Sequence, residues 1–125
     1  MKTIILDTNF LVIPFQFGID VFDEINKLIT GKHRIVTLQG VIRELKNLEK
    51  NKGKDSRAAK LGLELIERKE LEIIQTKEDN VDDAIVEIAD GNMIVATNDK
   101  ELIKRLKDKN VKVIYLRGKK RLELM

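Results

Sequence analysis

The sequence predicts an α/β protein built around a parallel sheet. Two unbroken apolar runs, Ile4-Ile5-Leu6 and Met93-Ile94-Val95-Ala96, have the composition of strands buried on both faces. Short apolar runs of this kind alternate along the chain with longer segments of helical periodicity, which is the pattern of a parallel sheet covered by helices.

The elements follow in order from these patterns. After a first strand near 2–7, the stretch around the lone Pro14 is expected to be irregular, with Phe10, Phe15 and Phe17 filling the core; a binding role for these aromatics is the minority interpretation. Apolar runs predict further strands near 34–38, 71–75, 92–97 and 111–116. Helical spacing, with breaks at Gly31, Asn51–Gly53 and Gly91, predicts helices near 19–30, 39–50, 55–69, 80–90 and 99–109.

Size and composition indicate one globular domain spanning residues 1–125. Hydrophobic residues make up 42% of the chain and charged residues 36%, which argues against disorder. There is no apolar stretch long enough to span a bilayer and no signal-peptide pattern. Together with the lack of cysteine, this predicts a cytoplasmic protein that does not bind membranes.

Basic residues form three groups although the net charge is only +3. Such groups around an acidic centre suit a phosphate backbone, and solvated helix faces are the ordinary alternative for any one group. The residues expected to contact RNA are Lys46, Lys50, Lys52, Lys54, Arg57, Lys100, Arg105, Arg117, Lys119, Lys120 and Arg121.

Two of the expected strands end in an acid, at Asp7 and Asp99. Open α/β sheets bind their ligands at the carboxyl ends of the strands, so these positions suggest a metal site. Each acid also has a structural explanation, because Asp7 with Thr8, Asn80 with Asp83, and Asn98 with Glu101 are patterns that cap helices.

Glu44 is harder to explain structurally. It is expected on the apolar stripe that Val41, Leu45 and Leu48 form, where a carboxylate at the core margin is costly unless a cation meets it. Together Asp7, Glu44, Asp83 and Asp99 would repel one another without a counter-ion. Carboxylates without histidine or cysteine nearby favour Mg²⁺ or Mn²⁺, and the single histidine, His33, is expected at the surface.

At these residues the chain resembles the PIN-domain nucleases. The resemblance rests on Asp7-Thr8-Asn9, Glu44, Asp83-Ala84-Ile85 and Thr97-Asn98-Asp99, and it covers nearly the whole sequence. It implies a three-layer fold with a five-stranded parallel sheet of order 3-2-1-4-5, and metal-dependent cleavage of RNA. Asp7, Glu44, Asp83 and Asp99 would then be the catalytic, metal-binding acids, with Thr8, Asn9, Thr97 and Asn98 as supporting polar residues. Asp82 competes with Asp83, which is preferred because Ala84 and Ile85 follow it.

The predicted activity is therefore that of an endoribonuclease in which a metal-bound water attacks the phosphodiester. Within the family the chain is similar to the branch that processes ribosomal RNA and to the toxins of toxin–antitoxin pairs. A homodimer, an antitoxin and a ribosome-assembly partner all stay open. A non-catalytic RNA-binding module is the serious rival, whereas receiver domains and aspartyl phosphatases are disfavoured because the acids they require are missing, as at Asn9.

Overall fold

A computed structural model describes residues 1–125 and contains one six-stranded sheet of order β3-β2-β1-β4-β5-β6. The predicted parallel arrangement and the order 3-2-1-4-5 are confirmed for the first five strands, and β6 adds an antiparallel edge. The strands are β1 (Lys2–Leu6), β2 (His33–Leu38), β3 (Glu72–Ile74), β4 (Met93–Ala96), β5 (Lys112–Arg117) and β6 (Arg121–Leu124).

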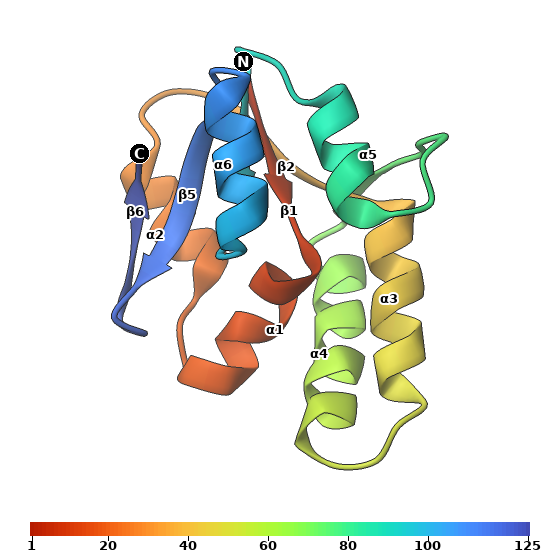
Figure 1. The fold of residues 1–125 in the computed structure, drawn as a ribbon. Coiled ribbons are helices and arrows are strands. Elements are labelled where there is room, and N and C mark those ends of the chain that lie inside the picture. The colour runs from red at the N-terminus through yellow and green to blue at the C-terminus, as the bar shows by residue number, and fades with distance from the viewer.

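Six helices surround this sheet. They are α1 (Thr8–Phe17), α2 (Val21–Leu28), α3 (Gln39–Glu49), α4 (Lys54–Arg68), α5 (Val81–Ile88) and α6 (Lys100–Asp108). In Figure 1, α6 lies in front of the sheet and α2 behind it, while α3 and α4 form a helical hairpin to one side of β1. None of these helices combines the length and the apolar character that crossing a bilayer requires.

The centre of the core is β1, which pairs with β2 on one side and β4 on the other. Ile4, Ile5 and Leu6 are completely buried, as expected for a strand covered on both faces. Each such side chain contributes about 1.5–3 kcal/mol through burial. This central position brings the carboxyl end of β1 beside that of β4, with Leu6 aligned to Ala96.

The stretch after β1 was expected to be irregular, and the structure shows instead that it is the helix α1. Asp7 caps its first turn by accepting a hydrogen bond from the backbone N–H of Phe10, and Gly18 ends it in the left-handed conformation at φ 66°. Pro14 removes one helical hydrogen bond, but burial of the residues before it holds the helix in place.

The expectation for the three aromatics was right for one of them. Phe10 is fully buried, whereas Phe15 and Phe17 are 40% and 39% exposed. Both exposed rings belong to the last turn of α1, beyond the segment that packs against the sheet. They are therefore not core residues.

The carboxyl-terminal basic segment was expected only as an RNA contact, and it also contains β6. Gly118 and Lys119 both adopt positive φ, 61° and 59°, as in the turns that join twisted antiparallel strands. Leu122 on the returning strand is buried and Glu123 lies opposite Tyr115. The alternation that predicts such a strand is only four residues long here, which is why the charged residues concealed it.

Candidate metal centre

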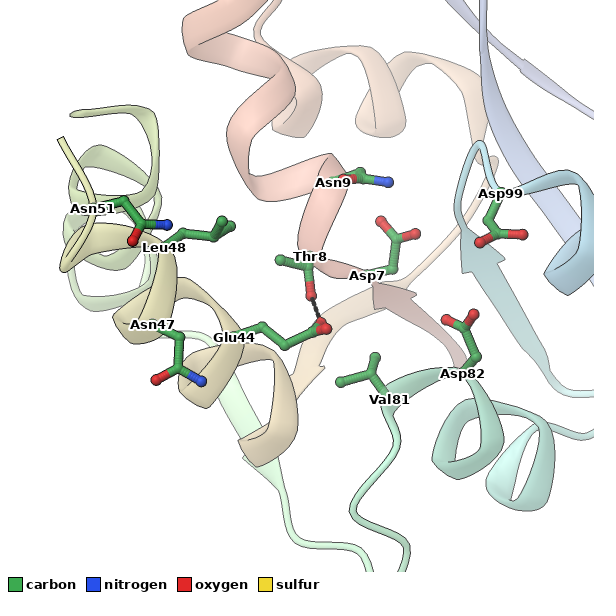
Figure 2. A pocket seen from close by; sticks show the side chains of 10 residues that line it. All are labelled: Asp7, Thr8, Asn9, Glu44, Asn47, Leu48, Asn51, Val81, Asp82 and Asp99. Carbon is green, nitrogen blue, oxygen red and sulfur yellow. Dashed lines mark hydrogen bonds between the residues drawn. The ribbon is translucent and has the colours of Figure 1, made fainter. Parts of the chain in front are cut away.

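A pocket of about 490 Å³ lies at the carboxyl ends of β1 and β4. Figure 2 shows acids from four elements around it: Asp7 after β1, Glu44 on α3, Asp82 on α5 and Asp99 after β4. The other lining residues are Thr8, Asn9, Asn47, Leu48, Asn51 and Val81. Eight of the ten are polar, so the pocket suits an ion and a polar ligand better than an apolar molecule.

Asp7 is the one acid of this group that is buried, with 5% of its surface exposed. Burial raises its pKa to about 7, because removing a carboxylate from water disfavours its charged form. Hydrogen bonds from Thr97 and from the backbone N–H of Phe10 lower the pKa in part, while the charges of Asp82 and Asp99 raise it further. A cation in the pocket would reverse this balance and keep Asp7 ionised.

Asp99 is held by two local hydrogen bonds. Its carboxylate accepts from the backbone N–H of Leu102 at 3.0 Å and so caps α6, while its own N–H donates to Thr97 Oγ1 at 3.1 Å. The expected cap at Asn98 is therefore wrong by one residue. Asn98 instead accepts from the N–H of Leu116 at 2.7 Å and donates to its carbonyl oxygen, which fastens the end of β4 to β5.

The third acid in the pocket is Asp82, although the sequence favoured Asp83. Asp83 is the third residue of α5, where its N–H donates to the capping side chain of Asn80 and its carboxylate pairs with Arg105 at 2.9 Å. Asp82 precedes it and lines the pocket. Its pKa is raised, first by burial and then by the charges of Asp99 and Glu44. Asp82, which the sequence pattern ranked below Asp83, thus fits the geometry of the pocket better.

Glu44 lies at the rim of the pocket and is exposed, so the expected position at the core margin is wrong. Thr8 Oγ1 donates a 2.5 Å hydrogen bond to its carboxylate, a contact that the orienting role expected of Thr8 requires. Asn47 and Asn51 also line the pocket and were not predicted. Asn47 follows Glu44 by three residues on the same face of α3, which is the signal that would have found it, whereas Asn51 lies beyond the end of α3.

These residues supply a donor set of the kind that a hard divalent cation prefers. The set contains carboxylate oxygens together with amide oxygens, and it contains no thiol or imidazole. In the structure, no group of three or more of these acids lies close enough together to hold a metal ion. A divalent ion in this arrangement would therefore contact at most two of the acids directly and keep several waters, as Mg²⁺ usually does.

The predicted RNA contacts fall in different places. Lys54 and Arg57 line another hollow, between α1 and α4, and Lys46 lines one on a different side of the α3–α4 hairpin. Arg105 is paired with Asp83. The remaining lysines of these two groups are exposed: Lys50 and Lys52 lie at the turn between α3 and α4, and Lys100 begins α6.

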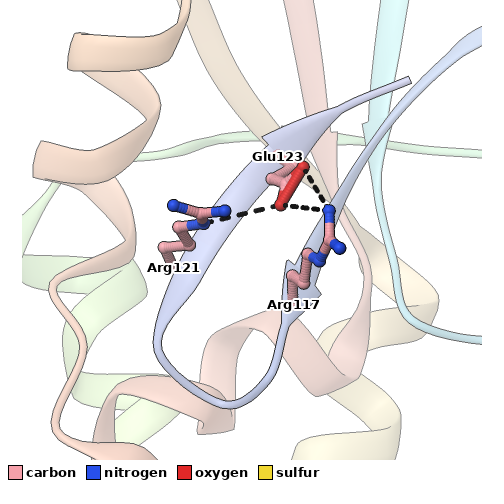
Figure 3. Close-up of polar contacts among 3 residues, drawn as sticks. All are labelled: Arg117, Arg121 and Glu123. Atoms are coloured by element: carbon pink, nitrogen blue, oxygen red, sulfur yellow. Dashed lines mark hydrogen bonds and ion pairs between the residues drawn. The ribbon is translucent and has the colours of Figure 1, made fainter.

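The basic group at the β5–β6 turn is partly neutralised. Figure 3 shows Arg117 and Arg121 against Glu123, at 3.2 Å and 3.5 Å. Lys119 lies over the ring of Phe17, 5.7 Å from its centroid, and Lys120 is exposed. Such exposed ion pairs contribute at most about 1 kcal/mol, so an incoming phosphate can displace them. His33 bonds to Asn26 at the start of β2, far along the strand from the pocket.

Solved structures share this fold. The structure of the PIN domain endonuclease Utp24 superposes with a TM-score of 0.80 at 23% identity, covering 98% of this chain and 90% of that one. VapBC-1 from nontypeable Haemophilus influenzae gives a TM-score of 0.57 at 13% identity, with 86% and 94% covered. Because these identities are low, the two structures show only that the fold is shared.

Two relatives share more of their sequence with this chain. Ribonuclease VapC4 of Methanocaldococcus jannaschii is 37% identical over 99% of this chain and 97% of its own length. Ribonuclease VapC9 of Archaeoglobus fulgidus is 32% identical over 97% and 87%. A family model described as a PIN like domain matches residues 4–119. Because both the family model and these relatives span almost the whole chain, the protein belongs to the PIN-like domain family.

Proposed function

We propose that this protein is an endoribonuclease that hydrolyses RNA phosphodiester bonds with Mg²⁺ or Mn²⁺ bound in the pocket that Asp7, Glu44, Asp82 and Asp99 line. The observation that carries the proposal is the buried carboxylate of Asp7, which faces a pocket rimmed by three further acids. Such a cluster is unfavourable without a cation, and it lies where α/β sheets bind their ligands.

The residues divide the work between holding the ion and orienting the acids. Asp7 and Asp99 follow the adjacent strands β1 and β4 and would provide the fixed part of the site, because each is fastened by a helix-capping hydrogen bond. Glu44 and Asp82 come from helices and would complete it from the opposite rim, with Thr8 orienting Glu44. When bound, the divalent ion supplies an activated water and offsets charge on the scissile phosphate.

The partner that the protein binds would show to which branch of the family it belongs. The two relatives named as VapC ribonucleases favour a toxin-type ribonuclease controlled by an antitoxin, and VapBC-1 shares the fold. A role in ribosomal RNA processing is the alternative. Co-purification of the protein with the product of a neighbouring small gene that blocks cleavage supports the toxin branch. Accumulation of uncut ribosomal precursor in a deletion strain supports the other.

The test is cleavage of single-stranded and structured RNAs in Mn²⁺, in Mg²⁺ and in EDTA. We expect wild type to cut only with metal, and Asp7→Asn and Asp82→Asn each to lose roughly 100-fold or more, since each removes a charged ligand. Asp83→Asn is the matched control, because Asp83 is its neighbour but is paired with Arg105 outside the pocket. Circular dichroism checks that each variant is folded.

Two results would count against the proposal. If Asp7→Asn cuts as fast as wild type, the acids do not hold a catalytic ion. If wild type binds RNA in Mn²⁺ and leaves it intact, the non-catalytic RNA-binding module becomes the better account. A loss in Asp83→Asn equal to that in Asp82→Asn would instead show that the assignment of the third acid is wrong.

A further inference from the structure

Two hollows continue the acidic pocket along the surface between α1 and α4. The first, of about 250 Å³, shares Asn9 and Leu48 with the pocket. The second, of about 450 Å³, shares Gln16, Asp55 and Ala58 with the first. Because each neighbouring pair has lining residues in common, the three form one groove that begins at the acids.

The far end of this groove carries an exposed aromatic ring. Phe15 lines the second hollow together with Lys54, Arg57 and Leu61, and it is 40% exposed. It also lines a further hollow, to which Pro14 and Phe22 contribute, so Phe15 borders two depressions of the surface. The core does not explain a phenylalanine in this position, because the buried part of α1 ends at Ile13.

The chemistry of the far end matches a nucleotide. An aromatic face stacks on any unpaired base, and the neighbouring cations match the phosphates on either side of that base. Phe15 follows Asp7 by eight residues, and α1 connects them, so the ring lies about 12 Å from the acids along the helix axis. Asp55 is the one acid in this part of the groove, which would direct the phosphates to the side of Lys54 and Arg57.

We propose that Phe15 is a stacking platform for one unpaired RNA base, a few nucleotides away from the bond that is cut. The groove between α1 and α4 thereby selects single-stranded substrate on that side of the scissile phosphate, since a base inside a duplex has both faces stacked on its neighbours. This inference rests on the proposed nuclease function and specifies how that site chooses its RNA.

The experiment measures binding separately from cleavage. A fluorescently labelled single-stranded RNA of about 12 nucleotides is titrated with the protein in EDTA, where no metal-dependent cutting occurs. We expect Phe15→Ala to weaken binding roughly 5- to 100-fold, and Phe15→Trp to restore it, because stacking needs only an aromatic face. Phe17→Ala is the matched control, because Phe17 is the same residue type in the same helix and is equally exposed, but it does not line the groove.

A second series replaces single bases of the RNA by abasic nucleotides, one position at a time. At the position that stacks on Phe15, the abasic RNA should bind wild type as weakly as it binds Phe15→Ala, while at other positions the variant should remain weaker than wild type. This non-additivity identifies a contact between one base and one ring.

The outcomes separate this inference from the proposed function. If wild type cuts RNA and Phe15→Ala binds as tightly as Phe17→Ala, the stacking platform is wrong and the nuclease stands. The platform is also wrong if Phe15→Ala leaves RNA binding unchanged and instead weakens binding of a protein partner. If the wild-type protein neither binds nor cuts RNA, the proposed function itself fails.

Discussion

At the scale of single residues, Asp7 shows how an acid of the candidate site can lower the stability of the metal-free protein. The residue is buried at the end of the central strand, and its pKa is raised to about 7 mainly by burial. In the unfolded chain the same carboxyl would ionise near its ordinary value of 3.8. Folding without a metal therefore favours the protonated acid, so the contribution of Asp7 to stability is fully present below about pH 4 and is lost as the pH rises to about 7.

This predicts that Asp7→Asn stabilises the metal-free protein. An asparagine keeps the capping oxygen for the N–H of Phe10 and removes the buried charge. Urea unfolding in EDTA should show a gain of up to about 4 kcal/mol at pH 8 and almost none at pH 4, since a shift of one pKa unit corresponds to about 1.4 kcal/mol. Saturating Mg²⁺ should narrow the difference at pH 8 by stabilising wild type. Equal stability of the two proteins at pH 8 in EDTA would contradict the prediction that the buried charge of Asp7 destabilises the metal-free protein.

The sequence located most of this site because strand ends are visible in it. Asp7 and Asp99 follow apolar runs, and Glu44 stands out on an apolar stripe. It did not distinguish Asp82 from Asp83, because consecutive residues of a helix differ by about 100° in direction and the choice depends on how α5 packs. The ion pair of Asp83 with Arg105 comes from another helix and leaves no local pattern.

At the scale of elements, the close packing of α1 against α4 shapes the groove. Gly62 in α4 lies so near α1 that an added Cβ would come within 3.0 Å of the carbonyl oxygen of Leu11. The obstacle is backbone in the middle of a buried helix, and it cannot rotate away as a side chain could. A glycine at this position therefore sets the distance between the two helices that line the groove.

We expect Gly62→Ala to destabilise the protein by up to about 2 kcal/mol. Alanine gains about 1 kcal/mol in helix propensity, and the strain of overpacking, about 1–3 kcal/mol, outweighs it. Thermal unfolding measures the change. Gly91→Ala is the control, because an added Cβ there meets nothing within 4 Å. A Gly62→Ala protein more stable than wild type would mean that α4 moves freely relative to α1.

The same elements show what sequence patterns could not supply. Residues 10–13 of α1 are all buried, so the helix lacks the alternation of polar and apolar faces by which α3 and α6 were predicted. Pro14 then argued against a helix that tertiary packing in fact stabilises. The four-residue β6 pairs only after Gly118 and Lys119 reverse the chain, a consequence of backbone conformation that the basic composition concealed.

At the scale of the whole molecule, charge is distributed by position. The acids lie at the carboxyl edge of the sheet, with Lys54 and Arg57 on the side of α4 and Lys119 and Lys120 at the β5–β6 turn. Lys32 and Lys112 are also exposed, but they lie at the opposite edge, just before β2 and at the start of β5. Exposed charges act over a Debye length of about 8 Å at physiological salt, so only the nearby groups should affect bound RNA.

The salt dependence of RNA binding tests this arrangement. Each phosphate contact contributes about 0.7 to the slope of log affinity against log salt for a single strand. Replacing both Lys54 and Arg57 by glutamine should therefore reduce the slope by roughly 1.4. The double replacement of Lys32 and Lys112 removes the same charge and should leave the slope unchanged. If both pairs reduce it equally, net charge rather than position governs binding, and the RNA does not follow the groove that leads from the acids to Phe15.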